Sequence, residues 1–154
     1  MKWGLKMSPA GKSPQFVIDY HGLEYLATTT NNAVKALGLT MLAEGVIAVP
    51  HKVWEEFRNL MPDEASGLAP SLTKRFNNLV KYRAYAATLA GKANSGFRLN
   101  PYEGSDLDAG AVAECEELPL LTVSGPAALF YKKVMSQDIL LIDGGQLEKY
   151  YKLN

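Results

Sequence analysis

Cysteine, histidine and long apolar runs are scarce in this sequence, and each scarcity argues against a class of function. Of the 154 residues only Cys115 is a cysteine, which excludes an internal disulfide and a cysteine-based zinc cluster. Two histidines, His21 and His51, argue against a histidine-rich zinc site. No stretch approaches the roughly 20 apolar residues of a membrane span, and the N-terminal segment lacks a secretory apolar core. We therefore expect a cytoplasmic protein that has no membrane partner.

The length and the composition indicate one globular unit. A chain of 154 residues can bury one substantial core and is short for two ordinary domains. Its 47% hydrophobic and 21% charged residues are typical of a soluble protein, and they exclude neither an enzyme nor a binding module. We predict a single domain over residues 1–154.

Charge is balanced over the whole chain but not along it. The sequence has 16 basic and 16 acidic residues. Between Ser71 and Arg98 lie six basic residues and no acidic one, which leaves ten basic and 16 acidic residues for the rest. The neutral total therefore hides a basic segment on an acidic body.

Short apolar runs alternate with helical patterns along the chain. Strands are expected at residues 16–19, 46–49, 120–123 and 139–142. Helices are expected at residues 21–27, 32–44, 50–60, 71–89, 106–118 and 125–133, with a loop between 60 and 71. This alternation predicts an α/β fold whose parallel sheet is covered by helices on both faces. In such sheets ligands bind beyond the carboxyl ends of the strands.

Two acidic residues stand out because of where they fall in these patterns. Asp19 ends the first expected strand, where a site would form, although a solvated strand-end carboxylate is the alternative. Glu56 shares an apolar helical stripe with Val53 and Phe57, so we expect it to face inward. A carboxylate there is costly unless a cation or hydrogen bonds offset its desolvation, and a structural ion pair with Lys or Arg is the alternative.

A third acidic position opens the helix expected at residues 106–118. Helical spacing places Asp108 beside Val112 and Cys115, while Asp106 precedes or caps the first turn. The helical pattern leaves both aspartates open, and one of them is expected to be an ordinary acidic cap. Carboxylates that converge in a cleft while ionised need a neutralising group, and a divalent metal ion supplies it.

Four segments in this order resemble the PIN family of nucleases. They are VIDYHGLEYL, PHKVWEEF, DLDAGAVAECEELPLLT and ILLIDGGQLEKY, and together they span most of residues 16–150. The resemblance implies a three-layer α/β/α fold with a central, mainly parallel sheet of four to five strands. It also implies an endoribonuclease that uses Mg²⁺ or Mn²⁺ to cleave single-stranded RNA, of the kind that serves as the toxin in toxin–antitoxin modules.

The same resemblance implies roles for individual residues. Asp19, Glu56 and Asp106 would be the catalytic metal ligands, with Asp108 and Ser124 in support. The spacing back from the LPLLT segment favours Asp106 over Asp108 as the third ligand. An antitoxin protein is an expected partner.

Two positions depart from the family pattern. His21 stands where the family often has Asn, and Ser124 stands where it often has a fourth acid. A serine hydroxyl can hold a metal-bound water but brings no charge, so metal affinity or activity would be reduced. The alternative function is a catalytically weakened PIN-like module that binds RNA or a protein.

The basic segment suggests an RNA-binding surface. Its residues interleave with aromatic ones that can stack on unpaired bases. The residues expected to contact RNA are Lys74, Arg75, Lys81 and Arg83, near Phe76, Tyr82 and Tyr85. The alternative is a helix that packs on the core or in a homodimer and leaves its charges solvated.

Overall fold

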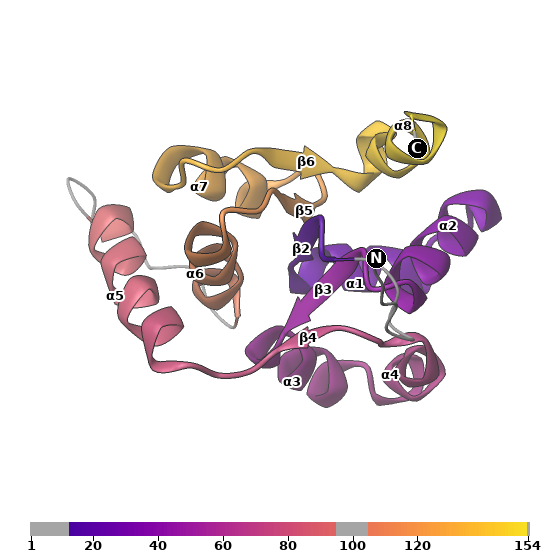
Figure 1. Ribbon diagram of the computed structural model, residues 1–154, viewed down its shortest axis with the longest axis horizontal. Helices are drawn as coiled ribbons and strands as arrows, with labels where there is room; N and C mark the ends of the chain where they lie inside the picture. Colours follow the sequence, from indigo (N-terminus) through magenta and orange to yellow (C-terminus); the bar gives the residue numbers. More distant parts are fainter. Residues whose placement is uncertain (1–12, 95–104, 154) are drawn as a thin grey trace, which may run out of the picture.

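A parallel sheet forms the centre of the molecule (Figure 1). The computed structural model describes residues 13–94 and 105–153, and within them five strands follow the order β4-β3-β2-β5-β6. All four neighbouring pairs are parallel. The strands are β2 (Phe16–Ile18), β3 (Ile47–Pro50), β4 (Arg75–Phe76), β5 (Leu120–Thr122) and β6 (Ile139–Leu141). The predicted α/β fold with a sheet of four to five strands is confirmed.

Helices cover both faces of this sheet. In Figure 1, α5, α6 and α7 lie on one side, and α1, α2 and α8 lie on the other. Helix α3 packs against α1, and α4 packs against α3. The bounds are α1 (Tyr20–Thr28), α2 (Asn32–Ala43), α3 (His51–Leu60), α4 (Pro62–Leu68), α5 (Val80–Asn94), α6 (Asp106–Glu116), α7 (Pro126–Val134) and α8 (Gln146–Leu153).

The chain changes direction across the sheet at its central strand, β2. It runs from β2 outward through β3 to β4, and then returns to place β5 on the opposite side of β2. The register pairs Val17 with Ala48 on β3 and with Leu120 on β5. A ligand site in an open parallel sheet forms beyond the strands that flank such a reversal. Here the two strands are β2 and β5. Asp19 directly follows β2, and Thr122 is the last residue of β5.

The prediction of one long helix over residues 71–89 is wrong. A short 3₁₀ helix, η1 (Ala69–Ser71), is followed by strand β4, and α5 begins only at Val80. The backbone N–H of Val49 donates to the carbonyl of Lys74 at 3.1 Å, and the Thr73 hydroxyl donates to the Ala43 carbonyl at 2.6 Å. These bonds hold the segment extended along β3, so it adds an edge strand to the sheet.

The prediction of a loop between residues 60 and 71 is also wrong, because this segment contains helix α4. Pro62 occupies the first turn of this helix, where the missing N–H of proline leaves no bond unmade. Two residues of this helix, Ala65 and Leu68, have buried side chains. Proline here marks the start of a helix rather than a loop.

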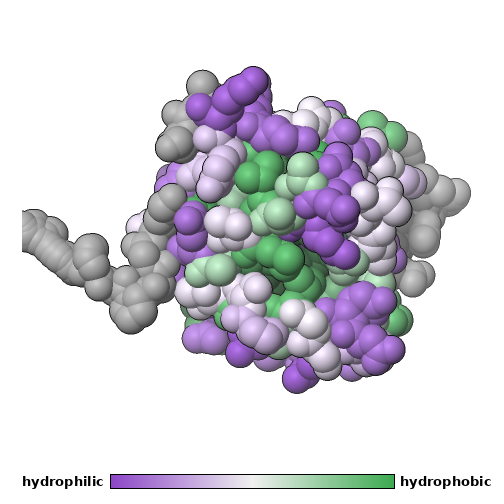
Figure 2. Space-filling model, turned by 90° about the vertical axis from the view of Figure 1, so that its right-hand side faces the viewer, coloured by the Kyte–Doolittle hydropathy of each residue, from purple (hydrophilic) through white to green (hydrophobic). Residues whose placement is uncertain are grey.

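The surface that carries α2, α4 and α8 is not uniform in polarity. Figure 2 shows this side of the molecule, with an apolar area in its middle that is ringed by polar side chains. None of the helices in residues 13–94 and 105–153 has the length and apolar character needed to cross a membrane.

Candidate metal centre

Asp19 is fixed at the carboxyl end of β2 by three hydrogen-bond donors. It is the N-cap of α1, where its Oδ1 accepts from the backbone N–H of Gly22 at 2.7 Å. Its Oδ2 accepts from the hydroxyl of Thr122 at 2.7 Å and from that of Tyr131 at 2.8 Å. The Asp19 side chain is fully buried, so these bonds determine the direction in which its carboxylate points.

Burial works against the charge of this carboxylate. Desolvation raises the pKa of Asp19 to about 6, although the hydrogen bonds from Thr122 and Gly22 and the charge of His21 oppose it. Burial, together with the negative charge of Asp19, also raises the pKa of Tyr131 well above 10, so the phenol remains a donor. A cation close to Asp19 would therefore stabilise its ionised form.

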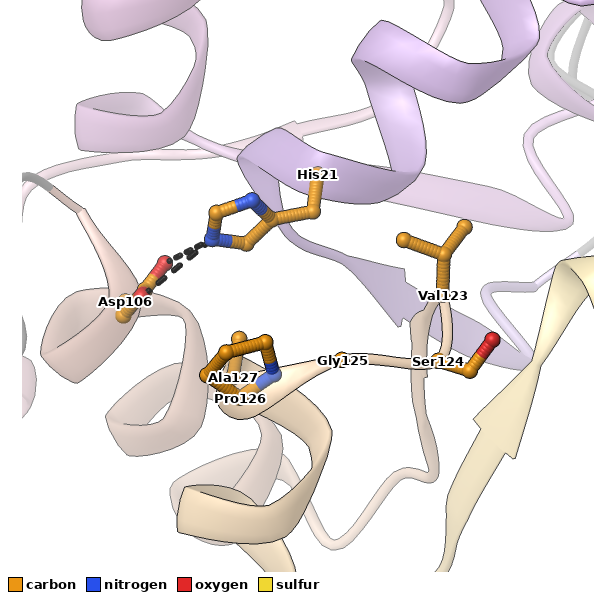
Figure 3. Close-up of a pocket in the computed structure, with 7 residues that line it drawn as sticks. All are labelled: His21, Asp106, Val123, Ser124, Gly125, Pro126 and Ala127. Atoms are coloured by element: carbon orange, nitrogen blue, oxygen red, sulfur yellow. Dashed lines mark hydrogen bonds and ion pairs between the residues drawn. The ribbon is translucent and has the colours of Figure 1, made fainter.

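His21 and Asp106 face each other (Figure 3), and both lie close to Asp19. His21 lies in the first turn of α1, and Asp106 is the first residue of α6. The Nε2 atom of His21 lies 3.1 Å from Oδ1 and 3.3 Å from Oδ2 of Asp106. The bond to Asp106 raises the pKa of His21 to about 9, burial opposes it, and the negative charges of Asp19, Asp106 and Glu56 add to the rise.

The three side chains form a set of atoms that fits a divalent metal ion. One carboxylate oxygen from each of Asp19 and Asp106 and one ring nitrogen of His21 all lie within 4.8 Å of one another. Two anionic oxygens and an imidazole nitrogen are ligands that divalent cations accept in proteins. The centre lies beyond the carboxyl ends of β2 and β5, at the reversal point of the sheet.

Glu56 lies next to this centre but outside the set of three. Its Oε1 accepts from both the backbone N–H and the hydroxyl of Ser105, at 2.9 and 2.6 Å. Ser105 is the N-cap residue of α6 and precedes Asp106. Glu56 on α3 therefore anchors the start of α6, which orients the carboxylate of Asp106.

Asp108 points to a different place from Asp106. It lines a neighbouring cavity of about 370 Å³ together with Lys52, Glu56 and Ser105. Burial raises the pKa of Asp108, and the positive charge of Lys52 opposes that rise. Of the two aspartates left open by the helical pattern, Asp106 is the one that approaches Asp19.

Ser124 lines the same pocket as His21 and Asp106, but its hydroxyl is engaged elsewhere. The hydroxyl and the backbone N–H of Ser124 both donate to the carboxylate of Asp143, which lies in the 3₁₀ helix η2 (Ile142–Gly144) after β6. In Figure 3 the Ser124 side chain points away from Asp106. At the position where a fourth acid is often found, this chain therefore has Ser124, whose hydroxyl donates to the carboxylate of Asp143.

No protein-family model and no curated protein matches this sequence. Solved structures do. VapBC2 from Rickettsia felis bound to a promoter DNA fragment matches with a TM-score of 0.60 at 15% identity, over 80% of this chain and 96% of that one. DNA-bound VapBC from Salmonella typhimurium matches with a TM-score of 0.60 at 13% identity, over 84% and 98%. PAE2754 from Pyrobaculum aerophilum matches with a TM-score of 0.56 at 15% identity, over 92% and 99%.

The chain has a PIN-like fold. At these identities the likeness concerns the architecture, and it confirms the fold that the four sequence segments imply. The roles of single residues rest on the geometry of this chain.

The basic segment meets the rest of the PIN-like fold through α5 and α6. The hydroxyl of the buried Tyr82 donates to Glu116 at 2.6 Å, and that of Tyr85 donates to Glu114 at 3.2 Å. Lys81 forms an ion pair with Glu116 at 3.1 Å. The two tyrosines therefore support helix packing within the chain, as the alternative interpretation of this segment expects.

Other basic residues of the segment remain on the surface. Arg83 is exposed and donates to the carbonyl of Asn78 at 3.3 Å. Lys74 and the exposed Arg75 lie at the start of β4. Phe97 and Arg98 lie outside the described residues. The RNA-contacting roles of Lys74, Arg75, Lys81 and Arg83 stay a prediction.

Three residues of the centre were not predicted from the sequence as contributors to it. His21 was identified as a departure from the family pattern rather than as a ligand. Thr122 and Tyr131 hold Asp19 from positions 103 and 112 residues away. A signal exists for His21, because a residue two positions after a strand-end helix cap lies in the first turn and near the same sheet edge.

Proposed function

We propose that this protein is a metal-dependent endoribonuclease acting on single-stranded RNA. The observation that supports it is the convergence of Asp19, Asp106 and His21 at the reversal point of a PIN-like sheet. Asp19 and Asp106 would hold Mg²⁺ or Mn²⁺, and Glu56 keeps Asp106 in place through Ser105. Ser124 lines the pocket of His21 and Asp106, and Asp108 lines the neighbouring one.

Different residues of the chain would have different roles in phosphodiester hydrolysis. A metal ion held by these residues would lower the pKa of an attacking water and stabilise the leaving oxygen. Thr122, Tyr131 and Gly22 keep the Asp19 carboxylate in one orientation, so it needs no rearrangement during the reaction. Lys74, Arg75 and Arg83 attract the RNA backbone without selecting a sequence.

Cleavage of a labelled single-stranded RNA tests this proposal. Protein treated with EDTA is expected to be inactive, and added Mn²⁺ or Mg²⁺ is expected to restore cleavage. Asp106→Asn should lower the rate by more than about 100-fold, because loss of a ligand costs more than loss of a group behind one. Asp106 suits the test because Asp19 carries three structural hydrogen bonds and its replacement could unfold the protein.

Asp138→Asn is the matched control for this experiment. Asp138 is an exposed aspartate before β6, away from the cluster, and its replacement should leave the cleavage rate unchanged. Cleavage that survives EDTA, or an Asp106→Asn variant as active as wild type, would contradict the proposal. Thermal unfolding of each variant shows that a lost activity is not a lost fold.

We also propose that the nuclease acts as a toxin held by an antitoxin protein. The architecture it shares with VapBC structures supports this assignment. Expression of the wild-type chain in bacteria should arrest growth, and expression of Asp106→Asn should not. Equal growth with both chains would contradict the toxin assignment and leave the cleavage assay as the test of the nuclease.

The second candidate is a PIN-like module that binds RNA or a protein without cutting. The observation in its favour is Ser124, which stands at a position where the family often has an acid. Its hydroxyl donates to the carboxylate of Asp143. This candidate predicts salt-sensitive RNA binding with no product in the presence of Mn²⁺ or Mg²⁺. Metal-dependent turnover would exclude it.

A further inference from the structure

His21 gives the candidate metal centre a nitrogen atom at a position where an oxygen would suit Mg²⁺. The side chain is 37% exposed, and its Nε2 faces both oxygens of Asp106. One ring nitrogen of His21, an oxygen of Asp106 and an oxygen of Asp19 all lie within 4.8 Å of one another. Imidazole therefore belongs to the group of atoms that would surround a cation here.

The kind of atom decides which cation such a site prefers. Mg²⁺ is a hard ion that takes oxygen ligands and keeps several of its waters. Imidazole nitrogen favours first-row transition metals, whose affinities generally rise from Mn²⁺ through Co²⁺ to Ni²⁺. Resting on the metal site of the proposed function, we propose that His21 Nε2 is a metal ligand that makes this centre prefer transition-metal ions to Mg²⁺.

The positions of the ligands support this assignment. Asp19 is held by three donors, so one side of the site is rigid. Asp106 starts α6 and is oriented by the bond between Glu56 and Ser105. His21 lies close to both carboxylates, on the first turn of a helix that Asp19 itself caps. A ring that lies close to two fixed carboxylates needs little rearrangement to share a metal ion with them.

A structural ion pair is the rival explanation for the same contact. In that case the imidazolium of His21 replaces the metal ion and neutralises Asp106. The other histidine of the sequence provides the comparison, because His51 Nε2 lies 3.2 Å from Glu55 one helical turn away. That pair is partly exposed on α3 and belongs to no three-ligand group among the described residues. His51→Asn is therefore the matched control for His21→Asn.

Calorimetric titration of the EDTA-treated full chain tests the preference, with Mn²⁺, Co²⁺, Ni²⁺ and Mg²⁺ each used alone. Wild type and His51→Asn should bind Ni²⁺ at least about tenfold more tightly than Mn²⁺, and Mn²⁺ more tightly than Mg²⁺. His21→Asn replaces the nitrogen with an amide oxygen. It should weaken Ni²⁺ binding by about tenfold or more and leave Mg²⁺ binding nearly unchanged.

Pulsed EPR of the Mn²⁺-loaded protein gives a second readout that does not depend on activity. Imidazole-nitrogen modulation should be present in wild type and His51→Asn and absent in His21→Asn. Metal binding without that modulation, or with an unchanged preference in His21→Asn, would overturn the role of His21 and leave the nuclease proposal intact. Failure to bind any of the four ions would overturn both.

Discussion

At the scale of single residues, the centre depends on how buried hydrogen bonds hold a carboxylate. Asp19 receives donors from the start of α1, from the end of β5 and from α7. Each donor comes from a different element, so the carboxylate keeps its orientation only in the folded chain. Tyr131 is the most remote of the three in sequence and is fully buried.

Tyr131→Phe removes one donor without changing the shape of the side chain. The loss of a hydrogen bond to a carboxylate should lower the free energy of unfolding by about 1–3 kcal/mol. Because a partner behind a metal ligand orients that ligand, metal affinity should also fall by about 10- to 100-fold. Chemical denaturation and calorimetry measure the two effects.

Tyr82→Phe is the matched control for that substitution. Tyr82 is also buried, and its hydroxyl donates to Glu116 on α6, away from the metal-ligand cluster. The Tyr82→Phe variant should lose a similar amount of stability and keep its metal affinity. An equal loss of metal affinity in both variants would show that Tyr131 acts on the whole fold rather than on Asp19.

At the scale of elements, Glu114 connects helix α6 to the segment that precedes strand β6. Its carboxylate accepts from the backbone N–H groups of Ser136 and Gln137, both at 2.9 Å, and from the hydroxyls of Ser136 and Tyr85. Burial alone would raise the pKa of Glu114, but these hydrogen bonds outweigh it and lower the pKa below 4.5. The ionised form is therefore the one that stabilises the fold.

Glu114→Gln should destabilise the protein in a pH-dependent way. The unfolded carboxyl has its ordinary pKa of 4.5, so the stabilisation is fully present above that pH and is lost as the pH falls through the lower folded value. We expect a loss of about 1 kcal/mol at neutral pH that shrinks as the pH falls below 4.5. Urea unfolding of wild type and variant across this range measures it.

Glu148→Gln on α8 controls for the loss of a carboxylate as such. Glu148 is exposed, and its replacement should change the free energy of unfolding by less than about 0.5 kcal/mol. A Glu114→Gln variant whose deficit stayed constant with pH would contradict the role given to the ionised carboxylate.

The elements predicted from the sequence are those whose pattern is long or strongly apolar. Helix α3 and strand β5 follow from an amphipathic stripe and an apolar run, and both lie within a residue or so of the expected bounds. Strand β4 has two residues and an alternating basic and aromatic sequence, so it has no period to detect. It forms because β3 offers a free edge, which is a property of the tertiary structure.

The centre was predictable in part for a similar reason. Asp19 follows a strand and Asp106 starts a helix, and both positions can be recognised locally. The bond from Thr122 to Asp19 and the bond from Ser105 to Glu56 join residues far apart in the chain. Only the folded topology brings these pairs together, so no local pattern announces them.

At the scale of the whole molecule, the uneven charge of the chain predicts how RNA would bind. Arg83 is exposed, whereas Lys81 is paired with Glu116. Arg83→Ala should weaken RNA binding for every sequence and reduce the salt slope by about 0.7, the value for one phosphate contact on a single strand. Lys81→Ala should have a smaller effect, because the ion pair already engages its charge.

Filter binding of single-stranded RNA at several salt concentrations measures both slopes. The Asp106→Asn background prevents cleavage during the measurement. Equal slopes for wild type and Arg83→Ala would contradict a phosphate contact at this residue and would place the RNA path elsewhere on the surface.

The candidate metal centre is tested most directly by a crystal structure of the protein soaked with Mn²⁺, with anomalous scattering recorded. We expect an anomalous peak among the carboxylates of Asp19 and Asp106 and the Nε2 atom of His21. A peak only in the neighbouring pocket of Glu55 and Asp108, or none between Asp19 and Asp106, would contradict it.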